Sequence, residues 1–454
     1  MITKTFKQRV IKASIWVISA NILTQFIRFG SNLITTRLLL PDAFGLVAIA
    51  QAIIMGLHFF VDIGLNQSLI RTNNSDPKFI NTIWTVRFLQ GIAVWMVSIL
   101  GAGFVYILAQ NGFFASDRVY ADTRLPLIII VSGFVSVISG FQSTNMVLAL
   151  RSLNFKKNVS IELLSQLVAL FAMVSLAYIY HSVWALVVGQ IIATVTLVYL
   201  SYALFEGNRN YFTIDKAQLK EIVHFGKWIF LCSIAAYLFI ASDKLILGVV
   251  IDKTLLGQYA IATLLIGAVK GLISTPISKL GLPALSEAFR ERPESLKSVF
   301  YKLRFPIDAI SMILAGFLFL SAETIVSILY NDRYQSVGWM LSIFAIGLIE
   351  FRYKLNGECY MAMGKPKLTT MLIFFDLVVL YIGMYLLYHF FGFVGLVWIV
   401  ACTSLSTIPL NLYFMQKNNL LDWKKEAITM PFIFLGLLFG YIFNYLVKLL
   451  STLI

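Results

Sequence analysis

Charged residues are scarce in this chain. Asp, Glu, Lys and Arg make up 13% of its 454 residues, whereas roughly a quarter of an ordinary soluble domain is charged. Histidine and cysteine are also few: four histidines lie on separate segments, and Cys232, Cys359 and Cys402 lie in apolar stretches. These absences predict no disulfide framework, no zinc site and no metal. The nearest approach to a phosphate-binding loop, Gly357 to Gly364-Lys365-Pro366, has the wrong spacing, so we expect no nucleotide or other cofactor and no enzyme activity.

Apolar stretches fill the rest of the sequence, because hydrophobic residues make up 59% of it. A helix that crosses a bilayer needs about 20 apolar residues. Windows of that length predict twelve spans and a thirteenth, at 13–36, 44–69, 80–108, 125–150, 159–180, 182–204, 223–242, 255–280, 304–328, 337–362, 369–389, 391–415 and 429–450. Runs this long exclude a β-barrel, whose strands alternate in polarity. The predicted fold class is an all-α integral membrane protein.

The formal net charge of +14 would suggest a nucleic-acid partner if the cations lay on a soluble face. Here they cluster in alternate links between the spans. The links on one side hold most of them, beginning with Lys4, Lys7, Arg9 and Lys12, and the other side has only Arg37, Arg118, Arg124, Lys244, Lys253, Arg333 and Lys448. This bias predicts a cytoplasmic N-terminus and no nucleic-acid partner.

The two halves of the chain resemble each other. A shift of 212 positions matches Trp16 to Trp228, Gly45 to Gly257, and Ala48-Ile49-Ala50 to Ala260-Ile261-Ala262. Six spans per half give both halves the same orientation, which is a parallel repeat about an axis along the membrane normal. We predict an N-lobe at 1–205, a cytoplasmic linker at 206–222, a C-lobe at 223–415 and an extra span within 416–454. The expected architecture is two six-helix bundles around a central cavity.

Polar residues inside the spans follow helical spacing. The stripes are Asn21, Gln25, Arg28 and Asn32; Gln51, His58, Asp62 and Asn66; and Ser132, Ser136, Ser139 and Ser143. Charges within lipid are costly, so Arg28, Arg87, Lys270 and Lys354, and the acids Asp62, Glu350 and Asp376, predict a wet cavity. The alternatives are helix packing for the serines, snorkelling or topology anchoring for the arginines, and a structural i,i+4 pair for Glu350 and Lys354. Asp62 and Asp376 could equally be hydrogen-bonded structural acids, and His58 a satisfied polar contact.

Several short motifs follow one another along the chain. They are Leu40-Pro41-Asp42-Ala43-Phe44-Gly45, Asp62-Ile63-Gly64-Leu65, Leu153-Asn154-Phe155-Lys156-Lys157, Ser182-Val183-Trp184-Ala185-Leu186, Leu256-Gly257-Gln258-Tyr259-Ala260 and Met363-Gly364-Lys365-Pro366-Lys367. Their order and spacing resemble those of the Wzx-type oligosaccharide flippases, in the polysaccharide transporter family of the multidrug/oligosaccharidyl-lipid/polysaccharide exporter superfamily. The resemblance covers about the first 415 residues.

This resemblance implies a multi-pass protein of the bacterial cytoplasmic (inner) membrane. It implies export of an undecaprenyl-diphosphate-linked glycan by alternating access, for O-antigen, capsule or exopolysaccharide assembly, with membrane lipid, a polysaccharide polymerase and a chain-length regulator as partners. We expect Asn21, Gln25, Arg28, Asn32, Arg87, Lys270 and Lys354 to bind substrate, and Asp62, Glu350 and Asp376 to carry a coupling ion.

Other functions stay open on the sequence alone. A multidrug transporter of the same superfamily should favour buried acids and aromatics over buried Arg and Lys, and a lipid II flippase is a closer rival. A membrane glycan polymerase or ligase would carry a large outer loop with catalytic residues, yet the link at 109–124 contains no His or Glu.

Overall fold

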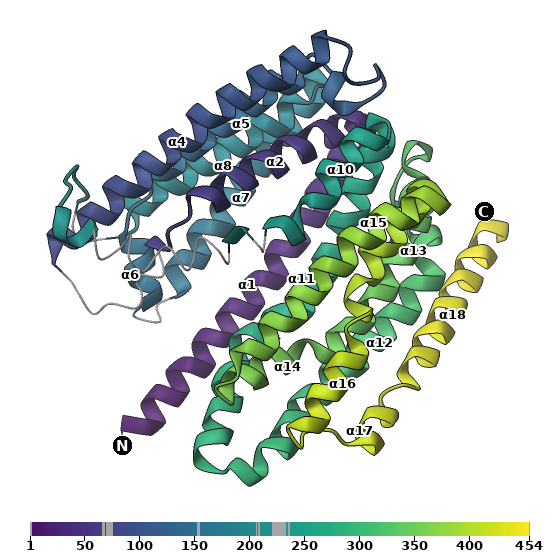
Figure 1. Cartoon of the computed structure of the whole chain (residues 1–454). Coiled ribbons are helices and arrows are strands. Elements are labelled where there is room, and N and C mark those ends of the chain that lie inside the picture. Colours follow the sequence, from purple (N-terminus) through teal and green to yellow (C-terminus); the bar gives the residue numbers. More distant parts are fainter. Residues whose placement is uncertain are drawn as a thin grey trace. The chain divides into compact units, whose positions relative to one another are not determined.

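The computed structural model describes residues 2–65, 69, 76–151, 155–205, 207, 209–219, 233–234 and 237–453 (Figure 1). Within these ranges the chain is helical and contains no strand. Nine of the described stretches are long and apolar enough to cross a membrane. The chain is therefore a multi-pass membrane protein. It divides into two compact units, Met1–Ala260 and Ile261–Ile454, called here the N-unit and the C-unit.

The N-unit is a bundle of long apolar helices. Its helices are α1 (Ile2–Leu38), α2 (Pro41–Val61), α4 (Pro77–Gln110), α5 (Leu125–Gly140), α6 (Asn145–Arg151), α7 (Phe155–Tyr180), α8 (Trp184–Ala203), α10 (Ser242–Val250) and the start of α11 (Lys253–Glu291). α4 packs along α5, α7 lies between α1 and α8, and α2 contacts α4, α5 and α10 (Figure 1). Glycines allow the closest approach: a Cβ on Gly91 would lie 2.4 Å from the carbonyl oxygen of Ser136.

Two predicted spans of the N-unit are shorter than the sequence indicates. α2 ends at Val61 instead of continuing to 69, because the Asp62 carboxylate accepts the backbone N–H of Gly64 (2.8 Å), whose φ of 66° only glycine adopts at little cost. The predicted span 125–150 is broken after Gly140, and Ser143 accepts the N–H of Asn145 (3.2 Å) at the start of α6. Asn66 lies outside the described residues.

The C-unit holds the rest of α11 and seven further helices. They are α12 (Leu296–Leu329), α13 (Ser336–Ile346), α14 (Phe351–Ala362), α15 (Pro366–Cys402), α16 (Ile408–Lys417), α17 (Trp423–Ile428) and α18 (Phe432–Leu453). Gly392, with φ 59° and ψ −141°, kinks α15 where the sequence predicts one span to end and the next to begin. The predicted seventh span, 223–242, lies mostly outside the described residues, so the proposed lobe boundaries stay a prediction.

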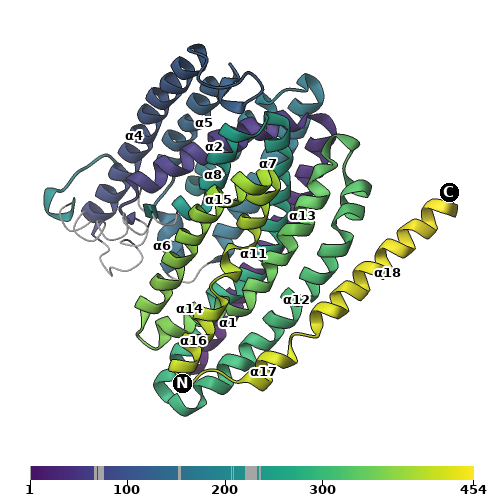
Figure 2. The ribbon, with the colours of Figure 1, turned by 45° about the vertical axis from the view of Figure 1, so that its right-hand side comes forward.

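The thirteenth predicted span is α18, and it packs along α12 (Figure 2). Their contact uses small residues at helical spacing. Cβ atoms on Gly316 of α12 and Gly436 of α18 would lie 2.3 Å and 2.2 Å from carbonyl oxygens of the facing helix, those of Ile433 and Ile313. Such close backbone approach is typical of helix pairs in membranes, where dispersion rather than water release drives association.

Candidate functional site

A cavity of about 670 Å³ with polar side chains in its wall lies within the N-unit, a volume within the ordinary range for ligand sites. α2, α4, α5 and α8 contribute its polar lining, which consists of Gln51, His58, Asp62, Gln90, Ser132, Ser136, Ser139 and Gln190. A smaller pocket of about 190 Å³ shares five of these residues and adds Arg87. The polar stripes predicted on the second and fourth spans thus meet in one place.

Hydrogen bonds across the helices fix the side chains of this cavity. The ring nitrogen Nε2 of His58 lies 2.8 Å from the hydroxyl of Ser136. Asp62 accepts a hydrogen bond from the Ser233 hydroxyl (3.2 Å), and Gln90 donates to the carbonyl oxygen of Val61 (2.6 Å). These hydroxyl and amide groups share the wall with apolar side chains such as Met55 and Phe59, and Asp62 is the carboxylate at the end of α2.

Arg87 lines the smaller pocket, which shares five residues with the larger one, and the two together are called the N-unit cavity. The Arg87 guanidinium donates a short hydrogen bond to the amide oxygen of Gln142. In the described ranges no carboxylate lies within ion-pair distance of it. A guanidinium with a neutral partner keeps its charge and spare donors for an anion, and its planar fork suits phosphate oxygens.

The predicted stripe on the first span lies on α1, which packs against α7. Asn32 is buried, Asn21 and Gln25 are partly buried, and Arg28 is exposed within the described chain. Glu162 of α7 lies within electrostatic range of Arg28. None of the four lines the N-unit cavity, so the structure does not bring them together with Arg87 there.

The C-unit brings the remaining candidate residues into one charge cluster. The Lys270 ammonium of α11 lies 3.7 Å from the Glu350 carboxylate. Asp376 of α15 lies within electrostatic range of Glu350 and Lys354. A 3-10 turn at Gly347–Glu350 precedes α14, and within the described residues Glu350 forms its ion pair with Lys270. Lys270 and Glu350 therefore form an ion pair, and Asp376 lies near both this acid and the Lys354 cation.

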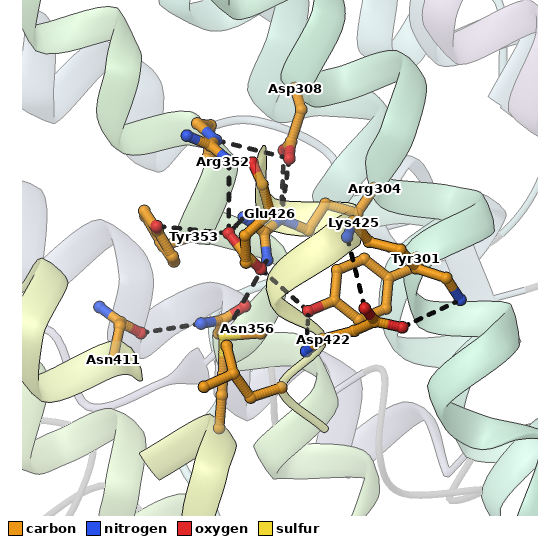
Figure 3. Close-up of polar contacts among 12 residues, drawn as sticks. Tyr301, Arg304, Asp308, Arg352, Tyr353, Asn356, Asn411, Asp422, Lys425 and Glu426 are labelled. Carbon is orange, nitrogen blue, oxygen red and sulfur yellow. Dashed lines mark hydrogen bonds and ion pairs between the residues drawn. The ribbon is translucent and has the colours of Figure 1, made fainter. Parts of the chain in front are cut away.

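A second buried charge network in the C-unit was not recognised from the sequence (Figure 3). Glu426 of the short helix α17 accepts hydrogen bonds from Arg304 (Nη2 to Oε2, 2.8 Å) and from Arg352 (3.3 Å). Arg304 also contacts Asp308 at 3.1 Å. Helical spacing does not indicate this network, because Glu426 is 122 positions away from Arg304 and lies outside the predicted spans.

Comparison with known proteins fits this architecture. Residues 34–338 match the family model described as "Polysaccharide biosynthesis protein". The chain belongs to this family. Among its relatives, a candidate O-antigen transporter of Shigella flexneri is 21% identical over 405 residues, which cover 85% of this chain and 93% of that protein. An uncharacterized membrane protein in the cps region of Klebsiella pneumoniae is 22% identical over 440 residues, 94% of this chain and 87% of that protein.

Solved structures show that this family member has the two-bundle fold of the MOP superfamily. The lipid II flippase MurJ in an inward closed conformation superposes with a TM-score of 0.64 at 12% identity, covering 97% of this chain and 92% of MurJ. An inward-facing multidrug resistance MATE transporter gives a TM-score of 0.60 at 13% identity, with 96% and 99% covered. These identities establish the fold alone. The predicted fold class and the family resemblance are thus confirmed.

Proposed function

We propose that this chain is a flippase for an undecaprenyl-diphosphate-linked oligosaccharide, working by alternating access. It moves the glycan from the cytoplasmic to the outer leaflet of the bacterial inner membrane, for O-antigen, capsule or exopolysaccharide assembly. Family membership and relatives in surface-polysaccharide systems support this proposal. The observation that carries it is the N-unit cavity, where the Arg87 cation stands among hydroxyl and amide groups.

Each part of the cavity suits one part of such a substrate. Hydroxyl and amide side chains hydrogen-bond to sugars, and a guanidinium binds diphosphate oxygens. We propose Arg87 as the first diphosphate contact, with Asn21, Gln25, Arg28 and Asn32 along α1 as further contacts. Lys270 and Lys354 join them only after rearrangement, because Glu350 pairs with Lys270 and Asp376 lies near Lys354 in this conformation.

The membrane potential supplies a driving force. Moving one negative charge outward across an inside-negative membrane gains about 2.3 kcal/mol per 100 mV, so a diphosphate favours its own export. We propose that Asp62, Glu350 and Asp376 take up a coupling proton or cation, which adds to this gain. The N-terminus lies in the cytoplasm in this proposal, and the protein acts by transport rather than by enzymatic chemistry.

Complementation of a flippase-deficient strain tests the proposal. We expect the wild-type chain to restore surface glycan, Arg87→Ala to abolish the restoration and Arg87→Lys to retain part of it. Arg290→Ala is the matched control, because the Arg290 side chain is 77% exposed and pairs only with its neighbour Glu291 at 3.9 Å among the described residues. Full restoration by Arg87→Ala, at equal amounts in the membrane, contradicts the cavity assignment.

The same strains separate the rival functions. Depletion of a lipid II flippase stops wall synthesis, whereas depletion of the proposed flippase removes only surface polysaccharide. Loss of a multidrug transporter lowers drug resistance and leaves the cell wall and the surface polysaccharide intact. Loss of a glycan polymerase or ligase leaves the lipid-linked unit on the outer leaflet, whereas loss of the flippase holds it on the cytoplasmic side.

A further inference from the structure

The loop between α4 and α5 ties two distant parts of the N-unit together by ion pairs. The Asp122 carboxylate accepts hydrogen bonds from Arg124 (2.7 Å) and from Lys253 (3.0 Å) at the start of α11. Arg124 also pairs with Asp42 at the start of α2 (3.2 Å). One loop thus links the first turns of α2 and α11, which are 212 positions apart in the repeat.

Backbone contacts reinforce the ion pairs. The Lys253 N–H donates to the carbonyl oxygen of Asp117 (3.1 Å), and the Arg118 guanidinium donates to that of Val250 (2.6 Å). Burial alone would raise the pKa of Asp122, yet hydrogen bonds from Arg124 and Lys253 outweigh it and hold that pKa well below its usual range. The carboxylate is therefore charged throughout the physiological pH range.

The two helix starts also touch directly, and the contact is reciprocal. A Cβ on Gly45 would lie 2.6 Å from the carbonyl oxygen of Lys253, and a Cβ on Gly257 would lie 1.7 Å from that of Pro41. The shift of 212 relates Gly45 to Gly257 and Pro41 to Lys253. Gly45 thus packs against Lys253, the repeat equivalent of Pro41, and Gly257 packs against Pro41 itself. A two-fold axis between the two helix starts requires such a reciprocal contact.

We propose that Asp42, Arg118, Asp122, Arg124 and Lys253, together with the Gly45–Gly257 contact, form an outer latch that closes the extracytoplasmic end of the transport path. The latch opens when the ion pairs break and the two helix starts separate, and the cavity beside Gln51 then becomes accessible from outside. This inference rests on the proposed transport function and on the predicted cytoplasmic N-terminus.

Accessibility of a reporter thiol tests the latch without reference to any substrate. Gln51→Cys lines the cavity, ten positions below Pro41 on α2, in a background where Cys232, Cys359 and Cys402 are serine. A membrane-impermeant maleimide added outside whole cells should label it slowly. We expect Asp122→Asn and Gly257→Ala to accelerate labelling. Gly267→Ala in the same helix is the matched control, because its added Cβ meets nothing within 4 Å. Equal labelling rates in all variants overturn the latch.

A reversible cross-link tests whether opening is required. In the cysteine-free background, Asp122→Cys and Lys253→Cys place thiols where side chains now meet at 3.0 Å. A short bis-methanethiosulfonate forms one disulfide with each cysteine and releases two methanesulfinate ions. This cross-link should block glycan export, and reduction of the two disulfides should restore it. Undiminished export by the cross-linked protein overturns the latch. If the variants label as expected but the chain exports no glycan in any state, the latch stands and the proposed substrate is wrong.

Discussion

The buried network around Glu426 gives the sharpest prediction on stability. Glu426 is 3% exposed, and its carboxylate faces two guanidinium groups, those of Arg304 (0% exposed) and Arg352 (2% exposed). Asp308 is the other acid of the network, so the four charges cancel. Glu426→Ala leaves two buried cations facing one carboxylate. Removing one partner of a buried pair costs about 3–5 kcal/mol, because the remaining charge loses both water and its counter-ion.

Thermal unfolding of the purified protein in detergent measures this loss. About 3–5 kcal/mol corresponds to a fall in Tm of roughly 6–20 °C for a unit of about 200 residues. Glu426→Gln keeps the side-chain volume and loses the charge, so most of the fall should remain. The matched control is Lys425→Ala, whose side chain is 45% exposed and pairs with Asp422 at 3.8 Å, a contact worth about 1 kcal/mol or less. Equal Tm values for Glu426→Ala and Lys425→Ala would refute the argument.

Three further results are expected. Gly436→Leu should separate α18 from α12, because even a Cβ would lie 2.2 Å from the Ile313 carbonyl oxygen, and a reduced yield of folded protein in size-exclusion chromatography checks this. Glu350→Ala should lower Tm more than the double variant Lys270→Ala/Glu350→Ala, because the single change leaves the Lys270 charge without its ion pair. The latch should be insensitive to pH between about 6 and 8. The Asp122 carboxylate, whose pKa is lowered, stabilises the closed state above the ordinary Asp pKa of about 4 and loses that effect as the pH falls below it. Gln51→Cys should therefore be labelled faster from outside only in acid.

Hydrophobic length predicted most of the membrane helices. Predicted spans coincide with α4, α7, α8, the first part of α15 and α18 to within a few residues at each end, since lipid imposes a minimum apolar length on each helix. α1 and α12 begin well before the spans predicted for them, and the predicted span 391–415 is divided between the end of α15 and α16. The predicted helix ends were wrong where a side-chain hydrogen bond or a glycine ends the helix before the apolar stretch does. Asp62 ends α2 by binding the Gly64 N–H, although apolar residues continue beyond it.

The N-unit cavity was partly foreseeable, because polar residues three or four positions apart share a helix face. His58 and Ser136 come from different stripes, and the structure places them 2.8 Å apart. The partners of the predicted charges were not foreseeable. Lys270 meets Glu350 across 80 positions, and Glu426 reaches Arg304 from a short helix between spans. Such pairings depend on tertiary packing, which helical spacing does not encode.

Transport of a defined substrate tests the central claim most directly. The purified chain is reconstituted into vesicles that carry a fluorescent undecaprenyl-diphosphate-linked oligosaccharide in one leaflet, and an impermeant quencher reports its arrival in the other. We expect transfer with the wild-type chain and with Arg290→Ala, and none with Arg87→Ala. Folded wild-type protein that transfers no more label than empty vesicles would contradict the account.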